Sequence, residues 1–84
     1  MELKKGNNKI YIESDDNKVL AEIDYEKQEN NDYNIYHTFV DESLRGQGIA
    51  SKLVEQAVND IKSKGGKVTA TCSYAKKWLE KNMK

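Results

Sequence analysis

Residues 48 to 64 carry a helical pattern between two strand-like segments, and this arrangement constrains the fold more than any other feature. The apolar stripe of this helix consists of Ile49, Ala50, Leu53, Val54, Ala57, Val58 and Ile61. Gly65 and Gly66 follow and are expected to end the helix. The flanking segments 33–40 and 67–72 have strand character. We therefore expect two parallel strands joined by a right-handed crossover helix.

The other segments predict a hairpin and a final helix. Residues 9–14 alternate apolar and polar side chains, turn residues follow at 15–17, and residues 18–28 alternate again. Residues 74–82 form a short amphipathic pattern that would bury Ala75, Trp78 and Leu79. The expected order is β-β-β-α-β-α. It corresponds to an α+β (α/β) fold with a mixed, twisted sheet of about four strands, a long crossover helix and a short C-terminal helix.

Length, charge and cysteine content restrict the classes of function. The chain of 84 residues is expected to form a single domain, residues 1–84. This length is close to the lower limit for domains that fold without disulfides or bound metals. Fourteen basic and fourteen acidic residues give no net charge, so we expect neither a nucleic-acid nor a membrane partner. The single cysteine cannot form an internal disulfide and fits a reducing compartment. No long apolar run is present, and the expected location is cytoplasmic.

The stretch LRGQGIAS, residues 44–51, lies where the central strand ends and the crossover helix begins. The first turn of a helix leaves backbone N–H groups unpaired and carries a partial positive charge. Gly46 and Gly48 remove the side chains that would keep a phosphate away, and Arg45 and Ser51 could add a guanidinium and a hydroxyl. Neither the Walker A pattern nor the dinucleotide G-x-G-x-x-G matches. By itself the pattern fits an anion site and a simple tight turn equally well.

Arg45-x-x-Gly48-x-Ala50 resembles the acyl-CoA signature Q/R-x-x-G-x-G/A of the GNAT superfamily of N-acetyltransferases. HTFV before the loop and CSYA after the next strand resemble the very small YjdJ-type GNAT-like proteins. The resemblance implies a minimal GNAT-like fold whose two parallel strands splay apart to admit acetyl-CoA. Backbone groups of Thr38, Phe39 and Val40 would pair with the pantetheine arm. The pyrophosphate would be held by the amides of Arg45, Gly46, Gln47, Gly48, Ile49, Ala50 and Ser51.

The resemblance also implies an activity, and the chain departs from the family pattern in two places. The implied reaction is transfer from acetyl-CoA, as cosubstrate and without a metal, to a primary amine on a small molecule, peptide or protein lysine. Leu79 stands where full members usually carry the tyrosine that protonates the CoA thiolate. The sequence ends at Lys84, before the usual closing hairpin. These departures favour the alternative of a non-catalytic acyl-CoA-binding module. A third alternative is a structural or interaction domain that keeps only the turn.

Three residues are candidates for the chemistry. Cys72 ends the second splayed strand and could accept the acetyl group itself, or it could be an inert hydrophobe that shares a face with Val68 and Ala70. His37 could be a base, or a core histidine satisfied by a neighbour, and spacing identifies no acidic partner for it. The structural role is favoured for His37. Tyr74 could replace the missing acid, or it could pack against the last helix.

Two charged groups have weaker functional interpretations. Glu22, Asp24 and Glu26 share one strand face, which is expected to be solvated but could attract a basic acceptor. Lys76 and Lys77 open the last helix and could contact the 3′-phosphate of CoA, although a solvated basic pair is the simpler interpretation. Neither group is needed for the predicted fold.

Overall fold

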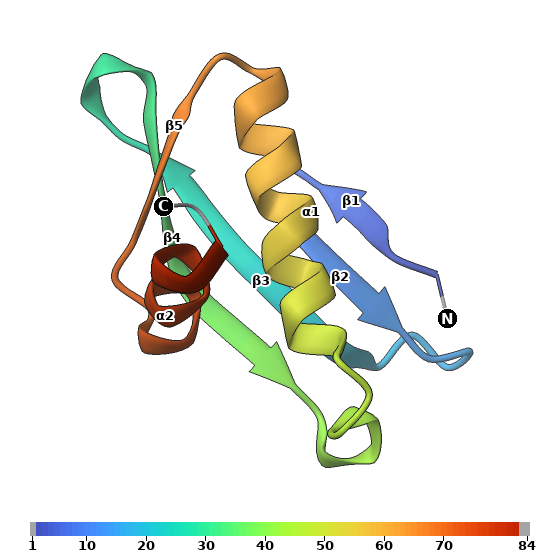
Figure 1. Cartoon of the computed structure of the whole chain (residues 1–84). Helices are drawn as coiled ribbons and strands as arrows, with labels where there is room; N and C mark the ends of the chain where they lie inside the picture. Colours follow the sequence, from blue (N-terminus) through green and yellow to red (C-terminus); the bar gives the residue numbers. More distant parts are fainter. Residues whose placement is uncertain (1, 83–84) are drawn as a thin grey trace.

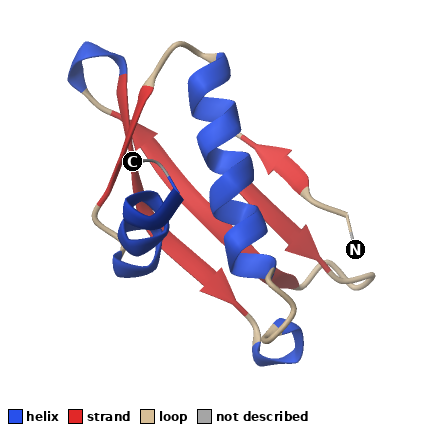
Figure 2. Ribbon diagram, viewed as in Figure 1, coloured by secondary structure: helices blue, strands red, loops and turns tan. Residues whose placement is uncertain are grey.

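The computed structural model describes residues 2–82, which form a mixed sheet with both helices on one of its faces (Figures 1 and 2). The elements are β1 (Lys4–Gly6), β2 (Lys9–Glu13), β3 (Val19–Lys27), β4 (Asp32–Val40), α1 (Ile49–Ser63), β5 (Lys67–Ala70) and α2 (Ser73–Asn82), with short 3-10 turns at Glu29–Asn31 and Glu42–Leu44. The sheet of this described part has five strands in the order β1-β2-β3-β4-β5. None of its helices is long and apolar enough to cross a bilayer.

The predicted order of elements is confirmed, with one strand more than expected. The pairs β1–β2, β2–β3 and β3–β4 are antiparallel, and β4–β5 is parallel, as the crossover pattern predicted. The additional strand, β1, has the sequence Lys-Lys-Gly and therefore no apolar alternation to reveal it. It forms because a turn with Asn8 in the left-handed conformation folds it back onto β2, where Lys5 pairs with Ile10.

The core lies between α1 and the sheet. Every α1 residue of the predicted stripe is buried except Ala50, which is partly exposed at the start of the helix. These side chains pack on buried residues of β2, β3 and β4, among them Ile12, Ile23 and Ile35. α2 lies beside α1, against β4 and β5, and adds Ala75 to the core, with Trp78 and Leu79 partly buried against it. The predicted contacts of this short helix are thus confirmed.

The helix α1 ends as the glycine pair predicted. Lys64 caps it, and Gly65 follows in the left-handed region with φ 75°. At Gly66 an added Cβ would come within 2.6 Å of the Tyr33 ring, so a side chain there would displace the start of β4. Gly65 therefore allows the backbone to turn at the end of the helix, and Gly66 allows the chain to pass close to Tyr33.

Asp60 is a buried carboxylate on the apolar face of α1. It accepts a hydrogen bond from the Tyr25 hydroxyl at 2.5 Å and pairs with Lys64 at 3.2 Å and with Lys5. Burial raises the pKa of Asp60, but the hydrogen bonds from Lys5, Tyr25 and Lys64 outweigh it and hold this pKa below its ordinary value. Burial also raises the pKa of Tyr25, so the phenol keeps the proton that it donates. The cluster joins β1, β3 and α1.

We expect Asp60→Asn to lower the free energy of unfolding at neutral pH by about 1 to 2 kcal/mol, because the substitution removes the anion from a buried hydrogen-bonded cluster while both ammonium groups keep contact with solvent. The pKa of Asp60 is lower in the folded protein than in the unfolded chain. Its contribution is therefore present above the ordinary aspartate value, about 3.9, and is lost as the pH falls toward the folded value. Urea denaturation between pH 7 and pH 2.5 measures this. The Asn variant should show a flatter pH dependence, whereas Asp15→Asn, at an exposed turn position, should leave the stability unchanged. If the free energy of unfolding depended on pH equally in the wild type and in Asp60→Asn, this prediction would be wrong.

Candidate functional site

The parallel strands β4 and β5 separate halfway along β4. They pair from Asp32 opposite Lys67 to Ile35 opposite Ala70. The amides of Thr71 and Cys72 then both donate to the Ile35 carbonyl, at 3.0 and 3.2 Å, and the chain turns into α2. Residues 37–40 of β4 remain paired to β3 on one side, after a register shift at Tyr36, and lie beyond the described pairing with β5 on the other. The splay that the family resemblance implied is therefore present.

Polar side chains connect β4 to β5 and to the residue that follows it, just before the two chain segments separate. The Asn34 amide donates to the Thr71 hydroxyl at 3.1 Å, and the Thr69 hydroxyl donates to the Asn34 carbonyl oxygen at 3.2 Å. Asn34 is itself 6 % exposed, so these bonds satisfy a buried amide. They fix the point at which the gap between β4 and α2 opens.

The loop between β4 and α1 keeps its glycines in conformations that other residues avoid. Asp41 accepts bonds from the amide and the hydroxyl of Ser43 and thereby fixes the first turn of the loop. Gly46 and Gly48 have φ values of 81° and 71°, and Gly48 is the N-cap of α1 without any side-chain cap. The first helical bond runs from the Lys52 amide to the Gly48 carbonyl at 3.2 Å. The N–H groups of residues 49–51 therefore have no carbonyl partner within the helix.

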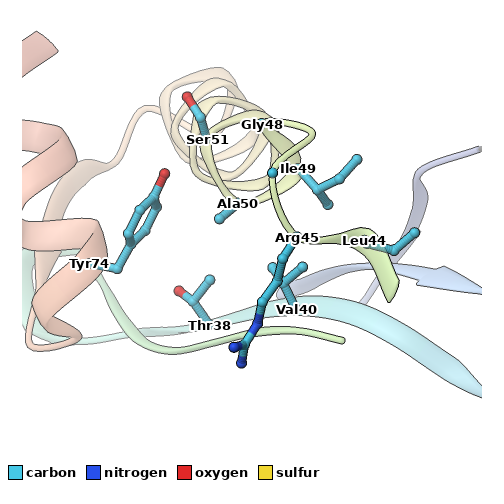
Figure 3. A pocket seen from close by; sticks show the side chains of 10 residues that line it. Thr38, Val40, Leu44, Arg45, Gly48, Ile49, Ala50, Ser51 and Tyr74 are labelled. Carbon is cyan, nitrogen blue, oxygen red and sulfur yellow. The ribbon is translucent and has the colours of Figure 1, made fainter. Parts of the chain in front are cut away.

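A cavity of about 380 Å³ opens between this loop, the outer half of β4 and the start of α2 (Figure 3). Its walls are formed by Thr38, Val40, Leu44, Arg45, Gly46, Gly48, Ile49, Ala50, Ser51 and Tyr74. Tyr74 stands on α2 and extends toward the first turn of α1. Of the residues predicted to hold the cofactor, only Phe39 and Gln47 do not line this cavity. Leu44, which the sequence analysis did not select, contributes a buried apolar wall.

Phe39 and Gln47 lie next to the cavity with their side chains engaged elsewhere. Phe39 is opposite Glu22 of β3, on the sheet face turned away from α1, and is 40 % exposed. The Gln47 amide donates to the Ser43 carbonyl at 3.4 Å, within the loop. Both were predicted to act through the backbone, and this role stays a prediction.

Trp78 connects α2 to the first turn of α1. Its indole N–H donates to the Ser51 hydroxyl oxygen at 2.9 Å, so that Ser51 keeps its own proton free to donate. Trp78 was predicted to be a packing residue, and the partly buried ring does pack against the core. Its hydrogen bond to a residue of the cavity wall could not be found from sequence, because the two positions are 27 residues apart.

Cys72 does not itself line the cavity, but its thiol contacts Thr38, which does. It packs against the core, partly buried, and its Sγ donates to Thr38 Oγ1 at 3.4 Å. Burial raises the pKa of this thiol, but the Thr38 hydroxyl and the backbone amides of Ala75 and Tyr74 lower it, and the net pKa lies below the ordinary value. Cys72 thus packs against the core, and its hydrogen-bond partners lower the pKa of its thiol.

His37 is not a core histidine, and that prediction was wrong. It lies opposite Asp24, on the sheet face turned away from α1, and half of its side chain is exposed. Its Nε2 is 3.8 Å from Glu22 Oε1, so the acidic partner that spacing could not identify comes from β3. The alternation of β4 places His37 and Phe39 on one face, but it does not tell which face α1 covers.

Glu22, Asp24 and His37 form a small cluster on that open face. One side-chain atom of each lies within 4.8 Å of the others. Burial and the neighbouring Glu22 carboxylate raise the pKa of Asp24, and Lys9 approaches Glu22 to 3.6 Å. Exposed acidic groups of this kind are common without a bound ion, and the sequence prediction of no metal stays a prediction.

Taken together, the mixed sheet, the separated parallel strands and the glycine loop that opens the crossover helix define a GNAT-like fold. Residues 9–84 match the family model described as GCN5-related N-acetyl-transferase. The chain belongs to this family of N-acetyltransferases, as the loop signature had suggested. Membership implies the use of acetyl-CoA.

Solved structures agree with this assignment. The NMR solution structure of a GCN5-like protein from Staphylococcus aureus has 46 % sequence identity and a TM-score of 0.78, over 95 % of this chain and 78 % of that one. A GNAT-family acetyltransferase from S. aureus Mu50 has 16 % identity and a TM-score of 0.65, over 88 % of this chain and 50 % of that one. Nourseothricin acetyltransferase has 17 % identity and a TM-score of 0.56, over 68 % of this chain and 34 % of that one. The last two show the fold alone, and this chain spans at most half of their length. No curated protein matches the chain.

Proposed function

We propose that this protein transfers the acetyl group of acetyl-CoA to a primary amine, and that acetyl-CoA binds in the cavity between β4 and the first turn of α1. The observation that carries the proposal is the start of α1: residues 49–51, whose N–H groups have no carbonyl partner within the helix, line the same cavity as Gly46 and Gly48. A diphosphate fits such a helix start because the amides point at it and the helix dipole favours its charge. Arg45 stands beside this position with an exposed side chain.

The outer half of β4 suits the pantetheine arm. Residues 36–40 have backbone groups on the side toward α2 that β5 does not use. Pantetheine contains two amides and can pair with such a strand as an added strand would. Thr38 and Val40 turn their side chains toward the cavity, and Leu44 and Ile49 supply apolar contact for the chain of the arm. The thioester would then lie near the start of α2, where Tyr74 and Cys72 are found.

We propose that the reaction proceeds through an acetyl-cysteine. Cys72 loses its proton to solvent, and the thiolate attacks the carbonyl carbon of the thioester. The new bond joins this carbon to Sγ, the bond from carbon to the CoA sulfur breaks, and the departing CoA thiolate takes a proton from the Tyr74 hydroxyl. A neutral amine then attacks the S-acetyl carbon, the bond to Sγ breaks, and the amine proton passes to a base or to water. The Cys72 thiolate is restored, and Tyr74 regains its proton from solvent.

One feature supports this route over direct attack by the amine. The Cys72 thiol contacts Thr38, and this hydroxyl and the amides that open α2 lower the pKa of the thiol. Leu79, partly buried against the core, cannot protonate the CoA thiolate, so in either route that proton is assigned to Tyr74. In direct transfer, His37 would take the proton of the amine from the open face of the sheet.

The second candidate is a non-catalytic acyl-CoA-binding module, which the apolar side chain at Leu79 favours. Release of CoA in the presence of a panel of amines separates the two. An enzyme releases CoA in proportion to the amide product, whereas a binding module returns acetyl-CoA intact. Both candidates require that acetyl-CoA bind, so binding must be tested first.

We expect a saturating concentration of acetyl-CoA to raise the Tm of the protein by about 10 °C. A concentration of a hundred times Kd stabilises the folded state by about 2.7 kcal/mol, and a domain of this size gains about 4 °C for each kcal/mol. Thermal denaturation followed by circular dichroism measures the shift. Pantetheine, which lacks the diphosphate, serves as control and should raise the Tm by far less. A Tm that responds to neither CoA nor acetyl-CoA would overturn the proposed function.

A further inference from the structure

Thr38 is a single side chain that faces both the cavity and the thiol. It lies on the outer half of β4, opposite Ile23, and this register turns it toward the side of the sheet that α1 covers. There it lines the cavity, while its hydroxyl oxygen is 3.4 Å from Cys72 Sγ. The pairing of β4 with β5 has ended three residues earlier, at Ile35. The Thr38–Cys72 bond therefore spans the gap between the separated strands.

The hydroxyl of a threonine can serve both states of a thiol. It accepts from the S–H group when the sulfur is protonated and donates its own hydrogen when the sulfur is ionised. The second bond is the stronger one because it is charge-assisted. The amides of Tyr74 and Ala75 at the start of α2 act on the same sulfur and also lower its pKa. Thr38 thus completes a set of donors around Cys72.

We propose that Thr38 is a positioning residue, whose hydroxyl holds Cys72 Sγ next to the cavity and stabilises its thiolate for attack on the thioester. The catalytic consequence of this role rests on the proposed acetyl-cysteine route. The effect on the thiol itself does not, because the ionisation of Cys72 can be measured without acetyl-CoA. Failure of the inference and failure of the route are therefore distinguishable.

The test is the pH dependence of Cys72 alkylation by iodoacetamide in the full chain. In Thr38→Val, which keeps the branched shape and removes the hydroxyl, the midpoint should rise by about one pH unit, the usual size of a lost charge-assisted hydrogen bond. Thr38→Ser restores the hydroxyl and should return the midpoint to the value of the wild type. The matched control is Thr71→Val, since the Thr71 hydroxyl bonds Asn34 and not the thiol.

A structural role for Thr38 alone would lower the Tm of Thr38→Val and leave the alkylation midpoint in place, and that result would overturn the inference. Equal rises in Thr38→Val and Thr38→Ser would also overturn it, because the hydroxyl would then be irrelevant. Should Thr38→Val not fold, Thr38→Ala compared with Thr38→Ser gives the same contrast. A shifted midpoint without any acetylated Cys72 in the wild type would support Thr38 and overturn the acetyl-cysteine route.

Discussion

Replacing Gly48 by alanine is expected to weaken CoA binding about ten- to a hundredfold in a protein that still folds. An added Cβ at Gly48 meets no protein atom within 4 Å, so it stands in open space at the cavity wall, where a diphosphate would approach the amides. The loss corresponds to one or two charge-assisted hydrogen bonds. Titration calorimetry gives Kd. The fluorescence of Trp78, the single tryptophan, offers a second readout because its indole bonds Ser51 in the cavity wall.

The control for this experiment is Gly65→Ala. Gly65 has φ 75°, close to the 71° of Gly48, so both variants carry the same backbone strain of about 1 kcal/mol. Gly65 lies at the other end of α1, and its added Cβ would meet only the Asn31 side chain at 3.8 Å. Gly65→Ala should therefore lose Tm as Gly48→Ala does and keep the CoA affinity of the wild type. Equal CoA affinities in Gly48→Ala and Gly65→Ala would show that the loop before α1 does not take part in CoA binding.

Replacing Cys72 by alanine is expected to reduce turnover about a thousandfold or more, because a covalent route does not proceed without its nucleophile. Incubation of the wild type with acetyl-CoA and no acceptor should leave one acetyl group on the peptide that contains Cys72. Hydroxylamine should remove this group, as it removes thioesters. Mass spectrometry of the digested protein detects both results, and Cys72→Ala should show no adduct at this peptide.

Measuring the CoA affinity of Cys72→Ala tells whether a loss of turnover comes from a lost chemical step or from misfolding. Cys72→Ala should bind CoA as tightly as the wild type, since the diphosphate site lies in the loop before α1. Loss of the packed sulfur should cost only about 1 kcal/mol of stability. Full turnover in Cys72→Ala would instead favour direct attack by the amine, and His37→Gln would then be the variant that slows the reaction.

The elements that carry a periodic pattern could be predicted from sequence, and those that depend on cross-strand register could not. The stripe of α1 and its glycine end were readable because the period of the apolar residues is the period of the helix. β1 was missed because two lysines and a glycine have no alternation, and only its pairing with β2 makes it a strand. Asp60 was missed for the opposite reason. It sits on an apolar face where only its partners, distant in sequence, make a carboxylate tolerable.

The candidate site divides in the same way. The loop from Arg45 to Ser51 was identified from local sequence, because the glycine conformations and the free amides of a helix start are local properties. The partner of His37 belongs to another strand and the partner of Cys72 to the far side of the splayed gap, so neither could be read from spacing. The bond from Trp78 to Ser51 likewise joins two helices. What sequence supplied was the place of the site, and what the fold added was the environment of its reactive groups.

The separation of β4 from β5 has a consequence for the empty protein. Backbone N–H and C=O groups that lack a neighbouring strand recruit strands from other chains, and proteins usually cover or charge such edges. The outer half of β4 is an edge of this kind, and its exposed side chains include Tyr36 and Phe39. A bound pantetheine arm would occupy the hydrogen-bonding positions along it. If the arm binds as proposed, the protein without its cosubstrate would self-associate more readily than the bound form, and acetyl-CoA would cover the sheet edge as well as donate acetyl groups.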